Sequence, residues 1–144
     1  MEEALAEAKA AAASGEVPVG AVVVVGDQIV SRAHNEVEKL QDASAHAELL
    51  ALQRASATLG EWRLSECSIF VTMEPCPMCI GAILLSRLKE LYFGCYDPVM
   101  GAVGSVFDLS SHPGLPRAVK VFHGLLEKES ESLVKQFFSE RRNG

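Results

Sequence analysis

The sequence predicts one α/β domain, built on a five-stranded, partly parallel sheet with helices on both faces. Its 144 residues are enough for one domain with a substantial core. Segments typical of strands alternate with segments typical of helices along most of the chain. Hydrophobic residues make up 49% of the sequence and charged residues 22%, which indicates an ordinary globular protein.

The N-terminal half predicts two helices with a hairpin between them. Residues 1–14 are rich in Ala, Glu and Lys, and Gly15 ends this helix. Residues 19–25 are almost all apolar and β-branched, which favours a strand buried on both faces. After a Gly-Asp turn, residues 28–33 form the second strand. Residues 35–43 are polar and predict a loop, and Ser44 is expected to cap a helix over residues 45–59.

The C-terminal half predicts a strand at 68–73, a helix at 77–87, a strand at 90–95, a loop rich in Gly, a last strand at 118–122 and a helix at 127–142. In this closing helix we expect Phe137 and Phe138 to face inward. Open sheets of this type bind ligands at the carboxyl ends of their strands, so chemistry is expected where residues 68–73 end.

Composition narrows the functional classes. The net charge of −6 argues against nonspecific nucleic-acid binding. No apolar run approaches the roughly 20 residues of a membrane helix, and the acidic start Met1-Glu2-Glu3 resembles neither a secretory signal nor a transit peptide. We therefore expect a cytoplasmic protein. In that compartment, its four cysteines indicate metal binding or thiol chemistry rather than disulfides.

The Cys76-Pro77-Met78-Cys79 segment, between a strand and a helix, allows three interpretations. A redox pair fits this context but gives no role to the earlier His46-Ala47-Glu48. A structural zinc site needs a fourth ligand, from Cys67 or Cys95. A catalytic zinc site needs only His46 and the two cysteines of the pair, with an open position for water and a nearby base, which Glu48 supplies.

The His-x-Glu pair is weak evidence by itself, because positions i and i+2 point about 200° apart on a regular helix. Both side chains reach one pocket only if His46 lies at an irregular helix start, and Ser44 as a cap supports that placement. His-x-Glu combined with Pro-Cys-x-x-Cys is the known signature of zinc-dependent nucleobase deaminases. Glu74, which precedes a proline, is expected to stabilise its loop through backbone hydrogen bonds.

Almost the whole chain resembles bacterial tRNA-specific adenosine deaminases of the TadA type, in the cytidine-deaminase-like superfamily. The metal motifs are shared by the superfamily. The segments that point to this branch are "EVPVGAVVV" (16–24), "GAVGSVFD" (101–108) and "FFSERR" (137–142). "DASAHAELLAL" (42–52) and "FVTMEPCPMCIGAILLSRL" (70–88) carry the metal motifs.

The resemblance implies a three-layer α/β/α sandwich with a five-stranded mixed sheet. It implies a single zinc-dependent deaminase domain over residues 1–144, acting as a homodimer whose interface lies near the active sites. The implied reaction converts adenosine to inosine at the wobble position of a tRNA anticodon. In this family the zinc ligands correspond to His46, Cys76 and Cys79, and the proton shuttle corresponds to Glu48.

The resemblance also implies substrate contacts. Asn35 would hydrogen-bond the purine, while Val17 and Met73 would line the base pocket. The tail of the closing helix would contact the anticodon stem-loop, through Phe138, Arg141 and Arg142.

Two segments depart from the family pattern: Val99-Met100, where a basic residue is common, and Pro116-Arg117, where Asn-His is usual. Both lie in parts that the family uses on RNA. They favour an alternative, a zinc deaminase of a free nucleobase or nucleoside of the guanine or cytosine type. A noncatalytic structural zinc module is a third possibility.

Overall fold

The computed structural model describes residues 1–143, and within them it contains a mixed sheet of five strands in the order β2-β1-β3-β4-β5. The predicted fold class is confirmed. The strands are β1 (Gly20–Val25), β2 (Gln28–His34), β3 (Cys67–Met73), β4 (Glu90–Cys95) and β5 (Lys120–His123). The helices are α1 (Glu2–Ala13), α2 (Val37–Leu40), α3 (Ala47–Leu59), α4 (Pro77–Leu85) and α5 (Glu127–Asn143).

The directions of the strands bring several chain segments to one edge of the sheet. β1 runs antiparallel to both β2 and β3, while β3, β4 and β5 are parallel to one another. As a result, the start of β1 lies beside the ends of β2 and β3, and Met73 at the end of β3 pairs with Cys95 at the end of β4. The loops that leave these strand ends therefore meet at this edge.

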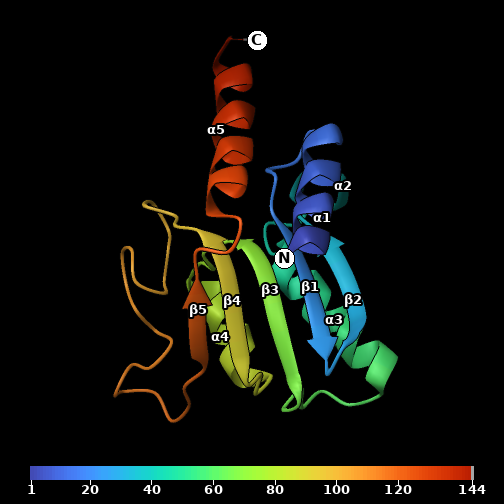
Figure 1. Ribbon diagram of the computed structural model, residues 1–144, viewed down its shortest axis with the longest axis vertical. Coiled ribbons are helices and arrows are strands. Elements are labelled where there is room, and N and C mark those ends of the chain that lie inside the picture. The colour runs from blue at the N-terminus through green and yellow to red at the C-terminus, as the bar shows by residue number, and fades with distance from the viewer. Residues whose placement is uncertain (144) are drawn as a thin grey trace.

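Helices cover both faces of the sheet. α1 and α5 contact one face, and α3 and α4 lie behind the other (Figure 1). α5 begins at the carboxyl end of β4, runs beside α1 and continues beyond the edge of the sheet (Figure 1). The result is the expected three-layer α/β/α arrangement.

The largest part of the core lies between the sheet and the α3/α4 layer. Alternate strand residues point to this face because side chains alternate across a strand. Fully burying one such side chain stabilises the fold by about 1.5–3 kcal/mol. The strand side chains in this core include Val23, Ile69, Val71, Leu91 and Phe93, and the helix side chains include Leu50, Ile80 and Ile83.

On the opposite face, α1 lies very close to β1. Its inward residues are Ala4, Ala8 and Ala11, all completely buried. A side chain at Gly20 would place its Cβ 2.0 Å from the Ala4 carbonyl oxygen and 2.5 Å from the Ala8 amide nitrogen. Gly20 is therefore the residue that allows the backbones of α1 and β1 to approach.

Three local differences between the predicted and the observed secondary structure have an identifiable cause. The segment expected to be a loop at 35–43 contains the short helix α2, whose amide groups are bound by a distant glutamate described below. Ser44 does not cap α3, because its N–H and hydroxyl both donate to the Asp42 carboxylate. The last strand begins at Lys120 rather than at 118, since the Val119 N–H donates to the Ser110 carbonyl in the preceding loop.

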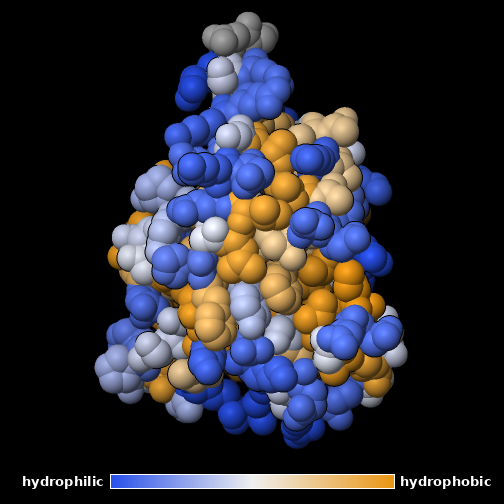
Figure 2. All heavy atoms as spheres, in the orientation of Figure 1, coloured by the Kyte–Doolittle hydropathy of each residue, from blue (hydrophilic) through white to orange (hydrophobic). Residues whose placement is uncertain are grey.

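Hydrophobic surface collects in the middle of the face that carries α1 and α5, while the outer turns of α5 are hydrophilic (Figure 2). The ten-element fold described over residues 1–143 includes no helix that is both long enough and apolar enough to span a bilayer.

Candidate metal centre and pocket

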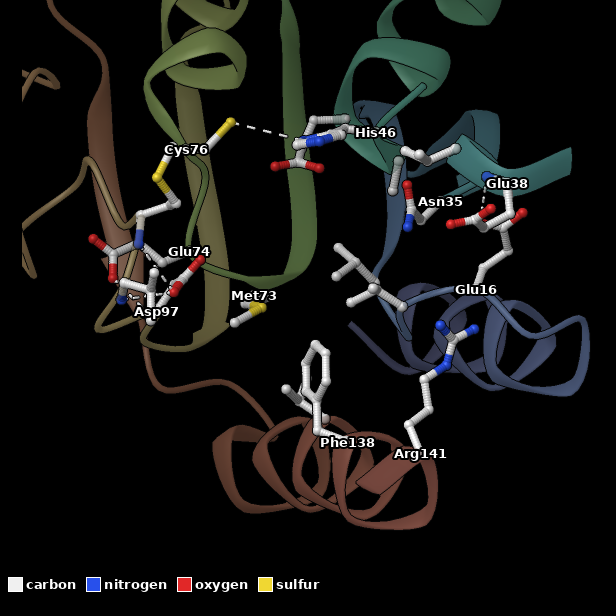
Figure 3. Close-up of a pocket in the computed structure, with 18 of the residues that line it drawn as sticks. Glu16, Asn35, Glu38, His46, Met73, Glu74, Cys76, Asp97, Phe138 and Arg141 are labelled. Carbon is white, nitrogen blue, oxygen red and sulfur yellow. Dashed lines mark hydrogen bonds between the residues drawn. The ribbon is translucent and has the colours of Figure 1, made fainter. Parts of the chain in front are cut away.

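Three metal-binding side chains meet at the sheet edge where β3 ends. His46 immediately precedes α3 and Cys76 immediately precedes α4, each with extended backbone, and Cys79 lies in the first turn of α4. Their ligand atoms all lie within 4.8 Å of one another. The structure therefore brings together residues that are 30 and 33 positions apart in the sequence, and Figure 3 shows the contact between His46 and Cys76.

The spacing of these donors fits zinc. The His46 Nδ1 atom lies 3.7 Å from the Cys76 Sγ atom and 3.5 Å from the Cys79 Sγ atom. Tetrahedral zinc with its usual bonds to sulfur and nitrogen separates such donors by roughly 3.5–3.8 Å. One imidazole and two thiolates are also the ligand types that zinc prefers.

The two cysteines differ strongly in acidity in the metal-free protein. A hydrogen bond from the Cys79 thiol lowers the pKa of Cys76 to about 4, and a further hydrogen bond from His46 adds to this effect. The same contact with Cys76, together with burial, raises the pKa of Cys79. The hydrogen bond with Cys76 also raises the pKa of His46. Cys79 is thus the protonated member of the pair and Cys76 the thiolate, and a bound cation would displace the Cys79 proton.

Glu48 lies beside these donors, in the first turn of α3. Because His46 precedes the helix with extended backbone, the pair is not separated by the 200° of a regular helix, and both side chains line one pocket. The Glu48 side chain is buried, and this burial raises its pKa to about 7. A carboxyl group with such a pKa can both accept and release a proton near neutral pH.

The other two cysteines lie apart from this group. Cys67 begins β3 at the opposite edge of the sheet, and Cys95 ends β4; both are buried. Burial raises the pKa of Cys95 to about 11. Within residues 1–143, His46, Cys76 and Cys79 are the one group of three or more potential ligands close enough to bind a metal. No fourth cysteine completes a structural zinc site there.

The metal-binding group opens into a cavity of about 590 Å³. Asn35 lines it and is only 8% exposed, and its Oδ1 atom has no hydrogen-bond partner. Phe138 and Arg141 point from α5 into the space that Asn35, Met73 and His46 face from the other sides (Figure 3). Of the predicted substrate contacts, the cavity lining includes Val17, Asn35, Met73, Phe138 and Arg141, but not Arg142.

Phe138 does not pack inward as expected. Phe137 is buried and stacks edge-on against Phe138, while 43% of the Phe138 side chain is exposed. The two residues are neighbours on a helix and point about 100° apart, so only one of them can face the core. Phe138 faces the cavity instead.

Buried glutamates stabilise two walls of the cavity. The Glu74 carboxylate accepts hydrogen bonds from the backbone N–H groups of Asp97, Val103 and Ser105, and from the Ser105 hydroxyl. The structural role predicted for Glu74 is confirmed. Sequence reasoning missed the equivalent role of Glu16, whose carboxylate accepts hydrogen bonds from the Glu38 and Lys39 N–H groups. The available signal was a single acidic residue at the start of the otherwise apolar segment 16–25.

Both departures from the family pattern lie on the surface. Val99 and Met100 are exposed and line the rim of the cavity. Pro116 and Arg117 are exposed in the connection between β4 and β5. Neither departure changes a residue of the His46, Cys76 and Cys79 group.

Comparison with known proteins agrees with this geometry. A family model of MafB19-like deaminases matches residues 1–142. The tRNA-specific adenosine deaminase of Bacillus subtilis (strain 168) is 44% identical over 142 residues, covering 99% of this chain and 88% of that protein. The chain belongs to the tRNA-specific adenosine deaminase family.

Comparison with solved structures agrees with this family assignment. A structure from a study of A-to-I editing by tRNA:A34 deaminases superposes with a TM-score of 0.90 at 41% identity, over 92% of this chain and 96% of that one. A guanine deaminase from Nitrosomonas europaea is more distant, with a TM-score of 0.80 and 26% identity over 96% of this chain and 82% of that one. Similarity is thus greater to the tRNA-directed deaminase than to the enzyme that acts on a free base.

Proposed function

We propose that this protein is a zinc-dependent hydrolase that converts adenosine to inosine at the wobble position of a tRNA anticodon. The observation that most strongly supports this proposal is a cavity in which a His/Cys/Cys donor set lies beside a buried glutamate with a pKa of about 7. Family membership supports tRNA as the substrate. We assign this activity to a single deaminase domain spanning residues 1–144.

His46, Cys76 and Cys79 would hold the zinc ion. When bound, zinc supplies Lewis acidity that lowers the pKa of a water molecule from 15.7 toward about 7. Glu48 accepts a proton from the attacking water and delivers it to the purine ring nitrogen. Oxygen from the water bonds to C6, and Glu48 then carries the proton that remains on this new hydroxyl group to the amino nitrogen, so that the C6–N bond breaks and the C6=O bond forms. Ammonia leaves, and adenosine becomes inosine.

Side chains around the cavity would orient the base. The Asn35 amide has an unpaired oxygen available to the purine, and Val17 and Met73 offer apolar surface to its ring. Phe138 and Arg141 border the same cavity from α5 and would contact neighbouring nucleotides of the anticodon stem-loop. Arg142, which lies outside the lining, would contact the phosphate backbone. A target in an anticodon loop is already unpaired, so little energy is needed to expose it.

We further propose a homodimer in the cytoplasm, where tRNA is available. α4 exposes Met78 and Leu85, with Leu85 exposed by 72%. These positions are seven residues apart and share one face of the helix, so they form an apolar strip on the element that carries the cysteines. A Leu85→Glu variant should be monomeric by light scattering, and an unchanged dimer would exclude this helix face.

The activity can be tested with two kinds of substrate. The zinc-loaded protein is incubated with an anticodon stem-loop bearing a wobble adenosine and, separately, with free purine and pyrimidine bases and nucleosides. Inosine is measured in the RNA by nucleoside mass spectrometry, and ammonia release is measured for the small molecules. We expect inosine only in the RNA. Ammonia from guanine or cytosine, with unmodified RNA, would support the free-base alternative and overturn the proposal.

A further inference from the structure

Glu16 is a buried carboxylate whose recorded partners are backbone amides. Glu16 is 2% exposed and lies in the segment that connects α1 to β1. Its Oε1 atom accepts from the Glu38 N–H at 3.0 Å, and its Oε2 atom accepts from the Lys39 N–H at 2.8 Å. Both donors lie in α2, 22 and 23 residues further along the chain. Glu16 therefore joins two distant segments of one cavity wall.

The segment that Glu16 binds carries Asn35. α2 begins two residues after Asn35, and the Asn35 N–H itself donates to the Val19 carbonyl at 3.1 Å. The connection from α1 to β1 thus fixes the Asn35 segment at two points, one at the Asn35 backbone and one just beyond it. The Asn35 side-chain amide, at the first of these points, faces the cavity with its Oδ1 atom unpaired (Figure 3).

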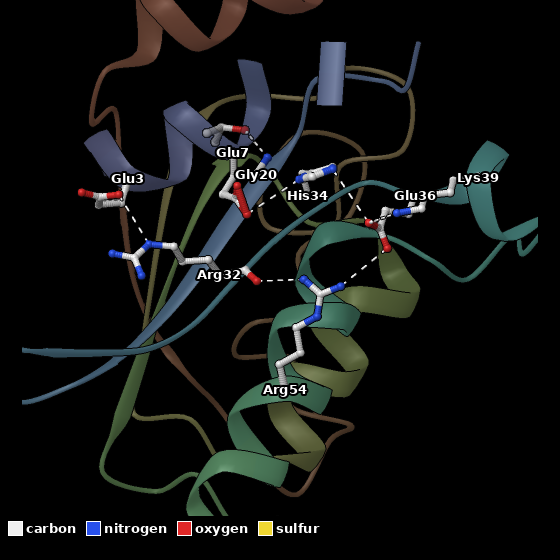
Figure 4. Close-up of polar contacts among 9 residues, drawn as sticks. Glu3, Glu7, Gly20, Arg32, His34, Glu36, Lys39 and Arg54 are labelled. Atoms are coloured by element: carbon white, nitrogen blue, oxygen red, sulfur yellow. Dashed lines mark hydrogen bonds and ion pairs between the residues drawn. The ribbon is translucent and has the colours of Figure 1, made fainter. Parts of the chain in front are cut away.

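Neighbouring Glu36 provides a natural comparison. Its side chain is 11% exposed; its carboxylate lies 3.9 Å from the His34 ring and pairs with two cations, Arg54 at 3.5 Å and Lys39 at 3.7 Å (Figure 4). The side chains of these two cations are 46% and 69% exposed, so water and salt screen both pairs. Hydrogen bonds from backbone amides to a buried carboxylate are stronger and leave two unpaired donors when broken. Glu16, rather than Glu36, should therefore determine how rigidly the segment lies.

We propose that Glu16 is a positioning residue for the substrate base, acting through Asn35. It does not touch the base. It binds the second and third amides of α2 and so keeps the Asn35 amide directed into the cavity. This inference rests on the proposed function, because it assigns to Asn35 a contact with the purine.

The first test needs no substrate. Hydrogen exchange is followed by mass spectrometry in the zinc-loaded full-length wild type, in Glu16→Gln and in the matched control Glu36→Gln. Peptides covering 35–41 should exchange at least about tenfold faster in Glu16→Gln, because a neutral amide binds the two N–H groups more weakly. Glu36→Gln should exchange like the wild type. Unchanged exchange in Glu16→Gln would overturn the proposal, whatever the enzyme acts on.

The second test is a double-mutant cycle on deamination of the wobble-adenosine stem-loop. Glu16→Gln and Asn35→Ala should each lower kcat/KM by about tenfold or more, the effect of losing one well-made hydrogen bond to a polar partner. If Glu16 acts through Asn35, the double variant should match Asn35→Ala alone. Zinc content and melting temperature report on the fold of each variant. Glu36→Gln should remain within about twofold of the wild type.

The outcomes separate the two claims. If the losses in kcat/KM of the two single variants multiply in the double variant, Glu16 acts independently of Asn35. That result would overturn the positioning role. A wild type that leaves the stem-loop unmodified would instead refute the proposed function, and the exchange measurement would still decide whether Glu16 fixes the Asn35 segment.

Discussion

Glu48 and Glu74 are both buried glutamates close to a metal-binding residue, but their surroundings differ. Glu74 is 3% exposed and accepts hydrogen bonds from three backbone N–H groups and one hydroxyl. Glu48 is 4% exposed, and its recorded partners are its own N–H and the Cys79 thiol. The first carboxylate is satisfied by fixed donors and stabilises a loop. The second has fewer donors, whose effect is smaller than that of burial, so its pKa is raised and it can carry a proton.

The largest effect is expected on activity, from Glu48→Gln. An amide fills the same space but cannot carry a proton, so turnover of the wobble-adenosine stem-loop should fall by about 10²–10⁴-fold. Zinc content, measured by elemental analysis, should match the wild type. Near-normal turnover in this variant would remove Glu48 from the mechanism.

Glu74→Ala should mainly affect stability. Three backbone N–H groups lose their acceptor in a buried site, which costs about 3 kcal/mol or more in the free energy of unfolding. Urea unfolding monitored by circular dichroism measures the loss. Glu48→Gln is the matched control, and its midpoint urea concentration should be at least as high as that of the wild type. A Glu74→Ala protein as stable as the wild type would show that water replaces the carboxylate.

The raised pKa of Glu48 also predicts a pH dependence in the metal-free protein. Its pKa is about 7 when folded and about 4.5 when unfolded, so the folded state binds the proton more tightly. This contribution to stability is present below pH 4.5 and is lost as the pH rises through 7. Between pH 5 and 7 the loss is on the order of 2 kcal/mol. Urea unfolding in chelator should show this decline in the wild type relative to Glu48→Gln; parallel pH profiles would contradict it.

The smallest effect is expected for Glu36→Gln. Because its cationic partners are largely exposed, we expect a change in unfolding free energy of less than about 1 kcal/mol. The wild type should also lose any such advantage in high salt, which thermal melts at two ionic strengths can measure. A loss as large as that of Glu74→Ala would mean that ion pairs with partly exposed cations stabilise the fold as much as buried hydrogen bonds from backbone amides do.

Local sequence patterns were sufficient for most of the fold. Apolar, β-branched runs and helical patterns located all five strands and four of the five helices described over residues 1–143, with boundaries within two residues. The missed helix α2 is four residues long and depends on Glu16, which is more than twenty positions away. No local pattern contains such a contact.

The candidate site was also only partly predictable from local sequence patterns. The motif spacing identified His46, Cys76 and Cys79 as a group, and the structure brings their ligand atoms together. The stated reason for the placement of His46 was wrong, since Ser44 binds Asp42 rather than capping α3. His46 itself occupies the position before the helix. The orientation of Phe138 toward the cavity also depends on where α5 lies, which the sequence pattern alone does not specify.

The connection from β4 to β5, residues 96–119, has a consequence for how enzymes of this kind diverge. It forms part of the cavity rim, yet residues 111–118 are all exposed and contribute nothing to the core. Substitutions there should cost little free energy of unfolding. The proposed metal ligands and Glu48 lie elsewhere, at the starts of α3 and α4. Pro116-Arg117 lies within this exposed stretch and Val99-Met100 lies on the cavity rim, so substitutions at both places should change the surface that meets a substrate more than the stability of the fold.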